Sequence, residues 1–208
     1  ELDVQLSADG QAMVFHDDAL DRLTGETGAV RDRTRAELEA ITLTDDGGMI
    51  PSLDKVLGMV VGKVPLLIEI KDQDGAMDPD VGPLEAATCR ALQDYKGDAA
   101  LMSFNPHAVA VCAKLAPDIP RGIVTASYQA MFWPEVPDHV RDTLRDIPDY
   151  DRVGACFISH EAADLDRPRV AELKAQGAKI LTWTIRSPEA EADARRIVDN
   201  VTFEGYLA

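Results

Sequence analysis

The chain of 208 residues has the length of one domain, and its hydrophobic content of 46% is ordinary for a globular protein. Its formal net charge of −16 argues against nucleic-acid binding, because a polyanionic partner needs a basic surface. No apolar stretch approaches the ~20 residues that span a membrane. The three cysteines are scattered without CxxC spacing, so we expect reduced thiols and a cytoplasmic location.

The chain begins with a strict alternation of polar and apolar residues over residues 1–7, and this period of two predicts a β-strand. In a barrel covered by helices, the polar face of such a strand points toward the barrel axis. Glu1 and Asp3 would then lie close together, which is unfavourable unless a cation lies between them. The alternative is a strand at the edge of a sheet with solvated acids.

Residues 8–50 form an acidic segment rich in turns, and long loops of this kind tend to be functional. Within it, residues 13–15 predict a short strand. Thr34 and Glu37 have the spacing of a capping box, which predicts a short helix.

Beyond residue 50, predicted strands alternate with predicted helices, which indicates a mostly parallel sheet. The predicted strands are residues 65–71, 99–104, 121–125, 155–159, 179–185 and 201–207. Helices are predicted after Ser52, over residues 81–95, 107–115 and 167–176, and after Ser187. Two further short helices are predicted within residues 127–146, which prolines interrupt. About seven strands of a (β/α) pattern are countable, one fewer than a closed (β/α)8 barrel requires. A doubly wound open sheet is the alternative, which the lack of a glycine-rich phosphate loop weakens.

Charged residues interrupt the apolar strand at residues 65–71, where Glu69 and Lys71 stand two positions apart. A charge in such a strand is seldom buried unless it is paired or bound to metal.

Four motifs occur in order: E-x-D-V-Q-x-x-x-D-G from residue 1, V-x-H-D-x-x-L-x-R-x-T-G from residue 14, P-S-L from residue 51 and L-x-I-E-I-K from residue 66. Together they resemble the glycerophosphodiester phosphodiesterase family, and residues 102–104, 182–185 and 203–206 resemble it more weakly.

The resemblance implies an α/β fold, the (β/α)8 TIM barrel, with residues 1–208 as a single catalytic domain and residues 8–50 as a small insertion over the barrel mouth. In the family, a strand with H-R-G and P-E-N motifs precedes the E-x-D-V strand and supplies a first catalytic histidine. We therefore expect the first barrel strand to be absent from this chain, which would be an N-terminally trimmed piece. Unpaired edges would make such a piece unstable or lead it to pair with another chain, for example in a homo-oligomer.

The resemblance implies that Glu1, Asp3 and Glu69 are ligands of a divalent cation, Mg²⁺ or Ca²⁺, with Mn²⁺ also suited to oxygen ligands. The alternative is a cluster of carboxylates paired with Lys71. His16 matches the family's general acid, and Asp17 is expected either to orient its imidazole or to serve as a turn residue.

The remaining site residues are expected to contact substrate. Lys71 would hold a phosphate oxygen, form an ion pair with Glu69, or do both. Arg22 matches the R-x-T motif and would contact phosphate or brace the insertion. Trp183 would pack on the carbon skeleton of the substrate or in the core, and Ser103 would contribute a hydroxyl. Of the three histidines that match no motif, His160 alone directly follows a predicted strand and so could face the mouth.

The resemblance implies metal-dependent hydrolysis of a small-molecule glycerophosphodiester to an alcohol and glycerol 3-phosphate, with histidine acid–base catalysis. One alternative is a related phosphodiesterase of the lysophospholipase D type, which acts on lysophospholipid head groups. The other is a non-catalytic barrel that binds metal or ligand.

Overall fold

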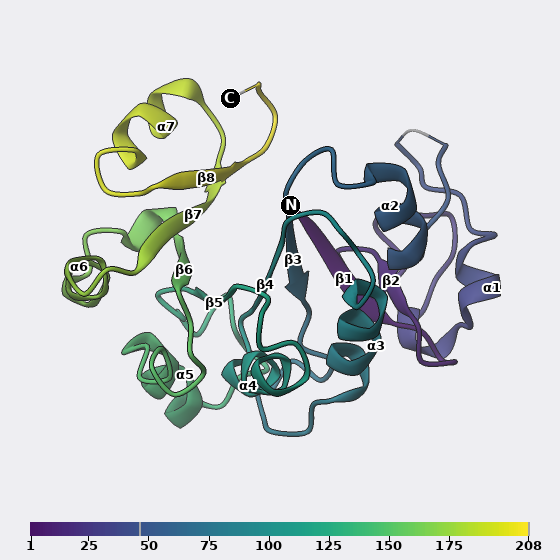
Figure 1. The fold of residues 1–208 in the computed structure, drawn as a ribbon, viewed down its shortest axis with the longest axis horizontal. Coiled ribbons are helices and arrows are strands. Elements are labelled where there is room, and N and C mark those ends of the chain that lie inside the picture. Colours follow the sequence, from purple (N-terminus) through teal and green to yellow (C-terminus); the bar gives the residue numbers. More distant parts are fainter. Residues whose placement is uncertain (46, 208) are drawn as a thin grey trace.

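The computed structural model describes residues 1–45 and 47–207, and these form one curled eight-stranded sheet with helices along its outer side (Figure 1). The strands are β1 Leu2–Leu6, β2 Ala12–Val14, β3 Leu66–Ile70, β4 Ala99–Ser103, β5 Arg121–Thr125, β6 Phe157–Glu161, β7 Lys179–Ile185 and β8 Asn200–Phe203. The helices are α1 Arg35–Leu38, α2 Leu53–Val60, α3 Pro83–Leu92, α4 Pro106–Leu115, α5 Asp138–Arg145, α6 Pro168–Ala175 and α7 Pro188–Ala194, with short 3-10 turns η1 Val30–Asp32 and η2 Ala162–Asp164.

The sheet order is β2-β1-β3-β4-β5-β6-β7-β8, and every pairing from β1 through β8 is parallel. The predicted alternation of parallel strands and helices is therefore confirmed. Strand β2 pairs antiparallel with β1 and lies at one end of the sheet, while β8 lies at the other. Among the described residues no pairing joins these two ends, so the sheet is a curled, open part of a barrel.

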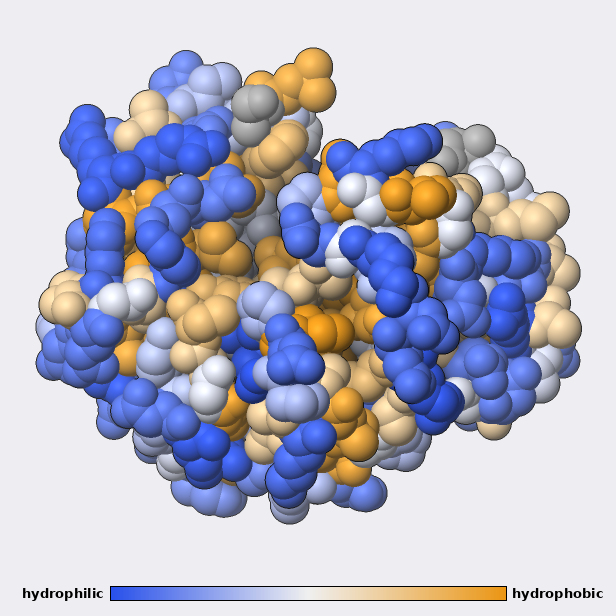
Figure 2. All heavy atoms as spheres, in the orientation of Figure 1, coloured by the Kyte–Doolittle hydropathy of each residue, from blue (hydrophilic) through white to orange (hydrophobic). Residues whose placement is uncertain are grey.

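The two faces of β1 differ as its alternation predicts. Val4 is fully buried, and it packs with Leu2 and Leu6 against apolar residues of α2 and α3. Asp3 points to the opposite face, toward the inside of the curl, since successive side chains of a strand alternate. In the view of Figure 2, hydrophobic residues show in the middle of the face, while hydrophilic residues cover much of the outer helices.

The described part of residues 8–50 packs around a small core of its own, which is formed by Met13, Phe15, Leu20, Val30, Leu38 and Ile50. The predicted capping box is present, because Thr34 accepts a hydrogen bond from the Glu37 amide while Glu37 accepts one from the Thr34 amide. The segment therefore carries enough buried apolar surface to hold its polar residues in fixed positions.

The prediction of two short helices within residues 127–146 is wrong for the first of them, because only α5 forms there. The turns before it are held by side-chain contacts. Arg141 of α5 donates hydrogen bonds to the carbonyl oxygens of Trp133 and Val136, so the segment is fixed without helical hydrogen bonds.

None of the helices within residues 1–45 and 47–207 combines the length and apolar character that crossing a membrane requires.

Candidate active site

Three carboxylates meet on the inner face of the sheet. Asp3 lies directly opposite Glu69 in the parallel register of β1 and β3, and Glu1 precedes β1 by one residue. One ligand oxygen from each of Glu1, Asp3 and Glu69 lies within 4.8 Å of the others. The structure thus brings the three predicted metal ligands together.

Lys71 bridges two of these carboxylates. Its Nζ lies 2.8 Å from Asp3 Oδ1 and 2.7 Å from Glu69 Oε1. Burial opposes its positive charge, but the charges of Glu69 and Asp3 outweigh this effect and raise the pKa of Lys71. The ion pair between Glu69 and Lys71, one of the alternatives from the sequence, is present.

The cluster nevertheless retains unfavourable negative charge. Desolvation of its carboxylate, followed by repulsion from Asp3 and Glu69, raises the pKa of Glu1 to about 7. Burial, followed by a smaller repulsion from Asp3, also raises the pKa of Glu69, against the opposing charge of Lys71. A donor set made only of carboxylate oxygens suits Mg²⁺, Ca²⁺ or Mn²⁺. These residues therefore fit a divalent cation in both donor chemistry and charge.

His16 lies beside this cluster, in the loop that follows β2. Its Nδ1 is 2.6 Å from Asp17 Oδ1, so Asp17 orients the ring as the sequence suggests. Arg22 holds the same carboxylate through Nε at 2.7 Å and Nη2 at 2.6 Å. Hydrogen bonding from Arg22, reinforced by His16, lowers the pKa of Asp17. Arg22 thus braces the loop, which was the alternative to phosphate contact.

Two adjoining hollows meet at these residues, with His16, Glu69, Lys71 and Phe104 lining both. The smaller, about 340 Å³, is also lined by the other two carboxylates and by Trp183. The larger, about 660 Å³, extends from the same centre toward residues 132–136. A substrate bound at the centre can therefore extend in two directions.

Trp183 lies at the wall of the smaller hollow and is only partly buried. Its Nε1 donates to the carbonyl oxygen of Ser159 at 3.1 Å, and its ring meets Phe104 edge to face at 5.4 Å. It is thus both packed against the barrel interior and available to a ligand.

Ser103 does not line either hollow. It is 1% exposed, donates its hydroxyl to the carbonyl oxygen of Ile70 at 2.6 Å, and accepts from the Asn105 amide at 3.1 Å. Its neighbour Met102 lines the smaller hollow, and alternation along β4 places Ser103 on the other face. The geometry therefore does not support the predicted contact between Ser103 and substrate.

The expectation that His160 faces the mouth is wrong. His160 lies within β6, is fully buried, and makes contacts with Thr125 Oγ1 at 2.8 Å and the Asp164 carbonyl oxygen at 3.1 Å. Burial lowers the pKa of His160 despite the opposing charge of Asp164. It is a hydrogen-bonded histidine of the outer face of the sheet.

The sequence interpretation missed the aromatic wall of the larger hollow, formed by Phe104, Phe132 and Trp133. The available signal was the run Met131-Phe132-Trp133 directly before Pro134. The sequence pattern places this run in a predicted short helix, and apolar residues of a helix are ordinarily part of the hydrophobic core.

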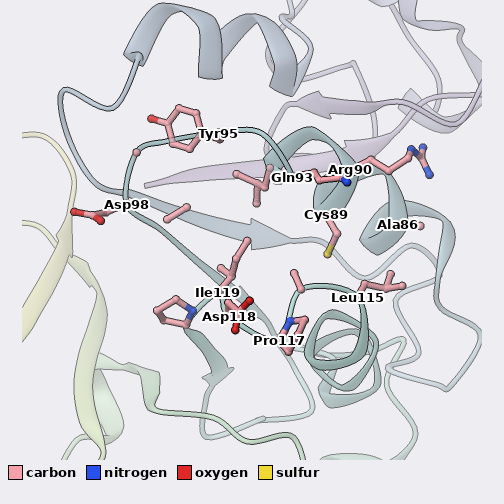
Figure 3. A pocket seen from close by; sticks show the side chains of 15 residues that line it. Ala86, Cys89, Arg90, Gln93, Tyr95, Asp98, Leu115, Pro117, Asp118 and Ile119 are labelled. Carbon is pink, nitrogen blue, oxygen red and sulfur yellow. The ribbon is translucent and has the colours of Figure 1, made fainter.

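Another hollow, of about 630 Å³, lies between α3 and the segment after α4, where Figure 3 shows Cys89, Arg90 and Asp118 among the residues around it. It includes Asp98 and Pro120, which immediately precede β4 and β5. Active sites of (β/α) barrels lie at the opposite, carboxyl ends of the strands. This hollow is therefore not the candidate active site.

Residues 1–202 match the model of the glycerophosphoryl diester phosphodiesterase family. The chain belongs to this family. Among curated relatives, the putative glycerophosphodiester phosphodiesterase YhdW of Bacillus subtilis is 27% identical over 200 residues, which cover 92% of this chain and 76% of the relative. A glycerophosphodiester phosphodiesterase of the same organism is 27% identical over 219 residues, covering 96% of this chain and 69% of the relative.

Solved structures show the same fold. The phosphodiesterase of Oleispira antarctica, in complex with the product sn-glycerol-3-phosphate, has a TM-score of 0.76 at 23% identity, covering 97% of this chain and 79% of that one. A putative glycerophosphoryl diester phosphodiesterase from Silicibacter pomeroyi DSS-3 has a TM-score of 0.76 at 25% identity, covering 97% and 78%. The predicted fold class, a barrel of the TIM type, is confirmed.

Proposed function

We propose that this protein hydrolyses glycerophosphodiesters, releasing an alcohol and glycerol 3-phosphate. The observation that carries the proposal is the convergence of the carboxylates of Asp3 and Glu69, the ammonium of Lys71 and the imidazole of His16 on one hollow. Membership of a phosphodiesterase family supports the same reaction.

Glu1, Asp3 and Glu69 would hold a divalent cation, Mg²⁺ or Ca²⁺, with Mn²⁺ as a further candidate. When bound, such an ion neutralises charge on the phosphate and eases deprotonation of a nucleophile. Lys71 then donates a charged hydrogen bond to a non-bridging phosphate oxygen, stabilising the negative charge that develops there.

His16 would act as a general acid. Because Asp17 holds Nδ1, the second ring nitrogen, Nε2, is left to deliver a proton to the oxygen of the departing alcohol. Asp17 and Arg22 are positioning residues in this scheme, since their contacts fix the ring and, unlike His16, neither of them lines the smaller hollow. Trp183 would pack on the carbon skeleton of the glycerol moiety.

We also propose that the chain is a single catalytic domain in which residues 8–50 cover part of the mouth. His16, Asp17, Asp18, Ala29 and Arg31 of this segment line the larger hollow, which supports that role. An insertion that covers part of the mouth would shield the bound phosphodiester from bulk solvent.

One observation favours the second candidate, a phosphodiesterase of the lysophospholipase D type. The larger hollow has an apolar side, which acyl chains would need. Turnover of lysophosphatidylcholine compared with glycerophosphocholine separates the two, and preference for the lysolipid would replace the first proposal.

The direct test is a Glu69→Gln variant of the intact protein, assayed for glycerol 3-phosphate release from glycerophosphocholine in excess Mg²⁺ or Ca²⁺. We expect at least a ~100-fold loss, the scale for removing one group that stabilises transition-state charge. Glu172→Gln, which removes an exposed carboxylate on α6, is the control and should retain activity. A fully active Glu69→Gln protein would overturn the assignment of Glu69.

A further inference from the structure

The larger hollow leads away from the proposed phosphate centre and combines aromatic surface with negative charge. Its lining includes Phe104, Phe132 and Trp133 on one side and Asp18, Asp74 and Glu135 among its acids. We propose that it is a subsite for the alcohol part of the substrate, selective for a cationic alkylammonium group such as that of choline. This inference rests on the proposed function.

The aromatic side is a continuous series of rings. Tyr128 and Trp133 have centroids 5.0 Å apart, Trp133 and Phe104 4.9 Å, and Phe104 and Trp183 5.4 Å. Because Phe104 lines both hollows, the series runs from the larger hollow past the centre to the smaller one. A substrate whose phosphate lies at the carboxylate cluster would have its alcohol part beside Trp133.

The wall is held in place before any ligand binds. Arg141, which is only 9% exposed, donates to the Trp133 carbonyl oxygen at 3.1 Å and to that of Val136. Arg145 donates to the Ser127 carbonyl oxygen at 2.9 Å. A wall that is already ordered loses little conformational freedom on binding, so its contacts contribute more fully to affinity.

Phe132 has no comparable packing role, because it is 65% exposed at the edge of this hollow. Exposed aromatic surface beside a cleft is characteristic of a binding surface. The faces of aromatic rings attract cations, and quaternary ammonium groups are recognised in this way.

The charge around the hollow has the sign that a cationic ligand needs. Asp18, Asp74 and Glu135 form no ion pair among residues 1–45 and 47–207. Of the described residues that line it, Arg31 supplies the one guanidinium, which donates to the Gln73 carbonyl oxygen at 3.0 Å. Lys71 also lines the hollow, but its ammonium is already paired with Asp3 and Glu69. Three carboxylates without an ion pair against the Arg31 guanidinium leave an excess of negative charge, so a cationic alcohol is favoured over a neutral one of the same shape.

The test compares kcat/KM for glycerophosphocholine with that for its uncharged isostere, the 3,3-dimethylbutyl ester of glycerol phosphate, and with glycerophosphoglycerol. We expect the choline ester to exceed the isostere by about fivefold, which is the scale of a partly exposed cation–π contact. Glu135→Gln and Phe132→Leu should each bring the ratio toward one. Two matched control variants should preserve this ratio of kcat/KM values. Asp118→Asn removes an exposed charge outside the hollow, and Met131→Leu alters the exposed neighbour of Phe132.

The outcomes separate this inference from the proposed function. Equal rates for the choline ester and the isostere would overturn the inference and leave phosphodiester hydrolysis intact. A preference for the isostere would also overturn it, in favour of apolar alcohols. If no diester is hydrolysed, the proposed function fails, and titration of tryptophan fluorescence with tetramethylammonium chloride decides the subsite. A response larger than that to sodium chloride, and weaker in Glu135→Gln, would support the subsite, whereas equal responses would overturn it.

Discussion

The candidate active site has two contrasting walls. The charged wall comes from the first 71 residues and consists of Asp3, His16, Glu69 and Lys71. The aromatic wall comes from later segments: Phe104 follows β4, Phe132 and Trp133 follow β5, and Trp183 lies within β7. The charged residues are held by ion pairs with one another, and the aromatic residues by ring contacts and carbonyl hydrogen bonds. The difference suggests a division of labour in which the first wall performs the chemistry and the second binds the organic parts of the substrate.

Substitution of Lys71 should have the largest effect on the charged wall. Lys71→Met removes the ammonium that contacts Asp3 and Glu69 and would contact phosphate, so kcat should fall by about 10²- to 10³-fold. Lys71→Arg should retain part of the activity because the charge is kept. Steady-state kinetics on glycerophosphocholine measure both, and a change confined to KM would place Lys71 outside the chemistry.

Asp17→Asn should have the next largest effect, because it weakens the contact that orients His16 and releases Arg22. We expect about a 10-fold loss of kcat with little change in KM, since general acid catalysis by a misoriented ring is only partly lost. Arg22→Gln, which keeps Asp17 in place, should cost less than about fivefold, the scale of an exposed ion pair. Equal losses in the two variants would argue that Arg22 itself touches the substrate.

On the aromatic wall, Trp183→Leu should act mainly on binding. The ring packs against Phe104 and faces the smaller hollow, so its loss should raise KM by about fivefold and leave kcat within about twofold. Measuring kcat and KM separately tests the division between the walls. A large fall in kcat would show that the two walls are not separable in this way.

Some of the features behind these predictions could be predicted from the sequence, and others could not. The strand alternation at Leu2–Leu6, the motif around His16 and the charged positions of β3 could be predicted, because local spacing fixes which side chains share a face. Trp183 was also expected at the site, but its contact with Phe104 and the contact of Phe104 with Trp133 could not be predicted, because these rings meet only through long-range packing. His160 was misplaced for the same reason: its outward direction depends on the register of β6 within the sheet.

His160 offers the smallest and most specific test, since it belongs to neither wall. Burial lowers the pKa of His160, so the native state keeps it neutral while the unfolded state takes up a proton below about pH 6.5. Its contribution to stability is therefore present above about pH 6.5 and is lost as the pH falls below that value. Urea unfolding at pH 7 and pH 5.5 should show that His160→Gln loses less stability between the two conditions than the wild type does. Identical losses would mean that His160 does not contribute to the pH dependence.

The central claim is that the carboxylates of β1 and β3 form a cation site that supports phosphodiester hydrolysis. The most direct measurement is glycerol 3-phosphate release from glycerophosphocholine by the intact protein, first stripped with EDTA and then titrated with Mg²⁺ or Ca²⁺. The account predicts that EDTA abolishes release, that one of the two ions restores it, and that Asp3→Asn shifts the restoring concentration upward by at least about tenfold. Full activity in EDTA, or an unchanged ion requirement in Asp3→Asn, would contradict it.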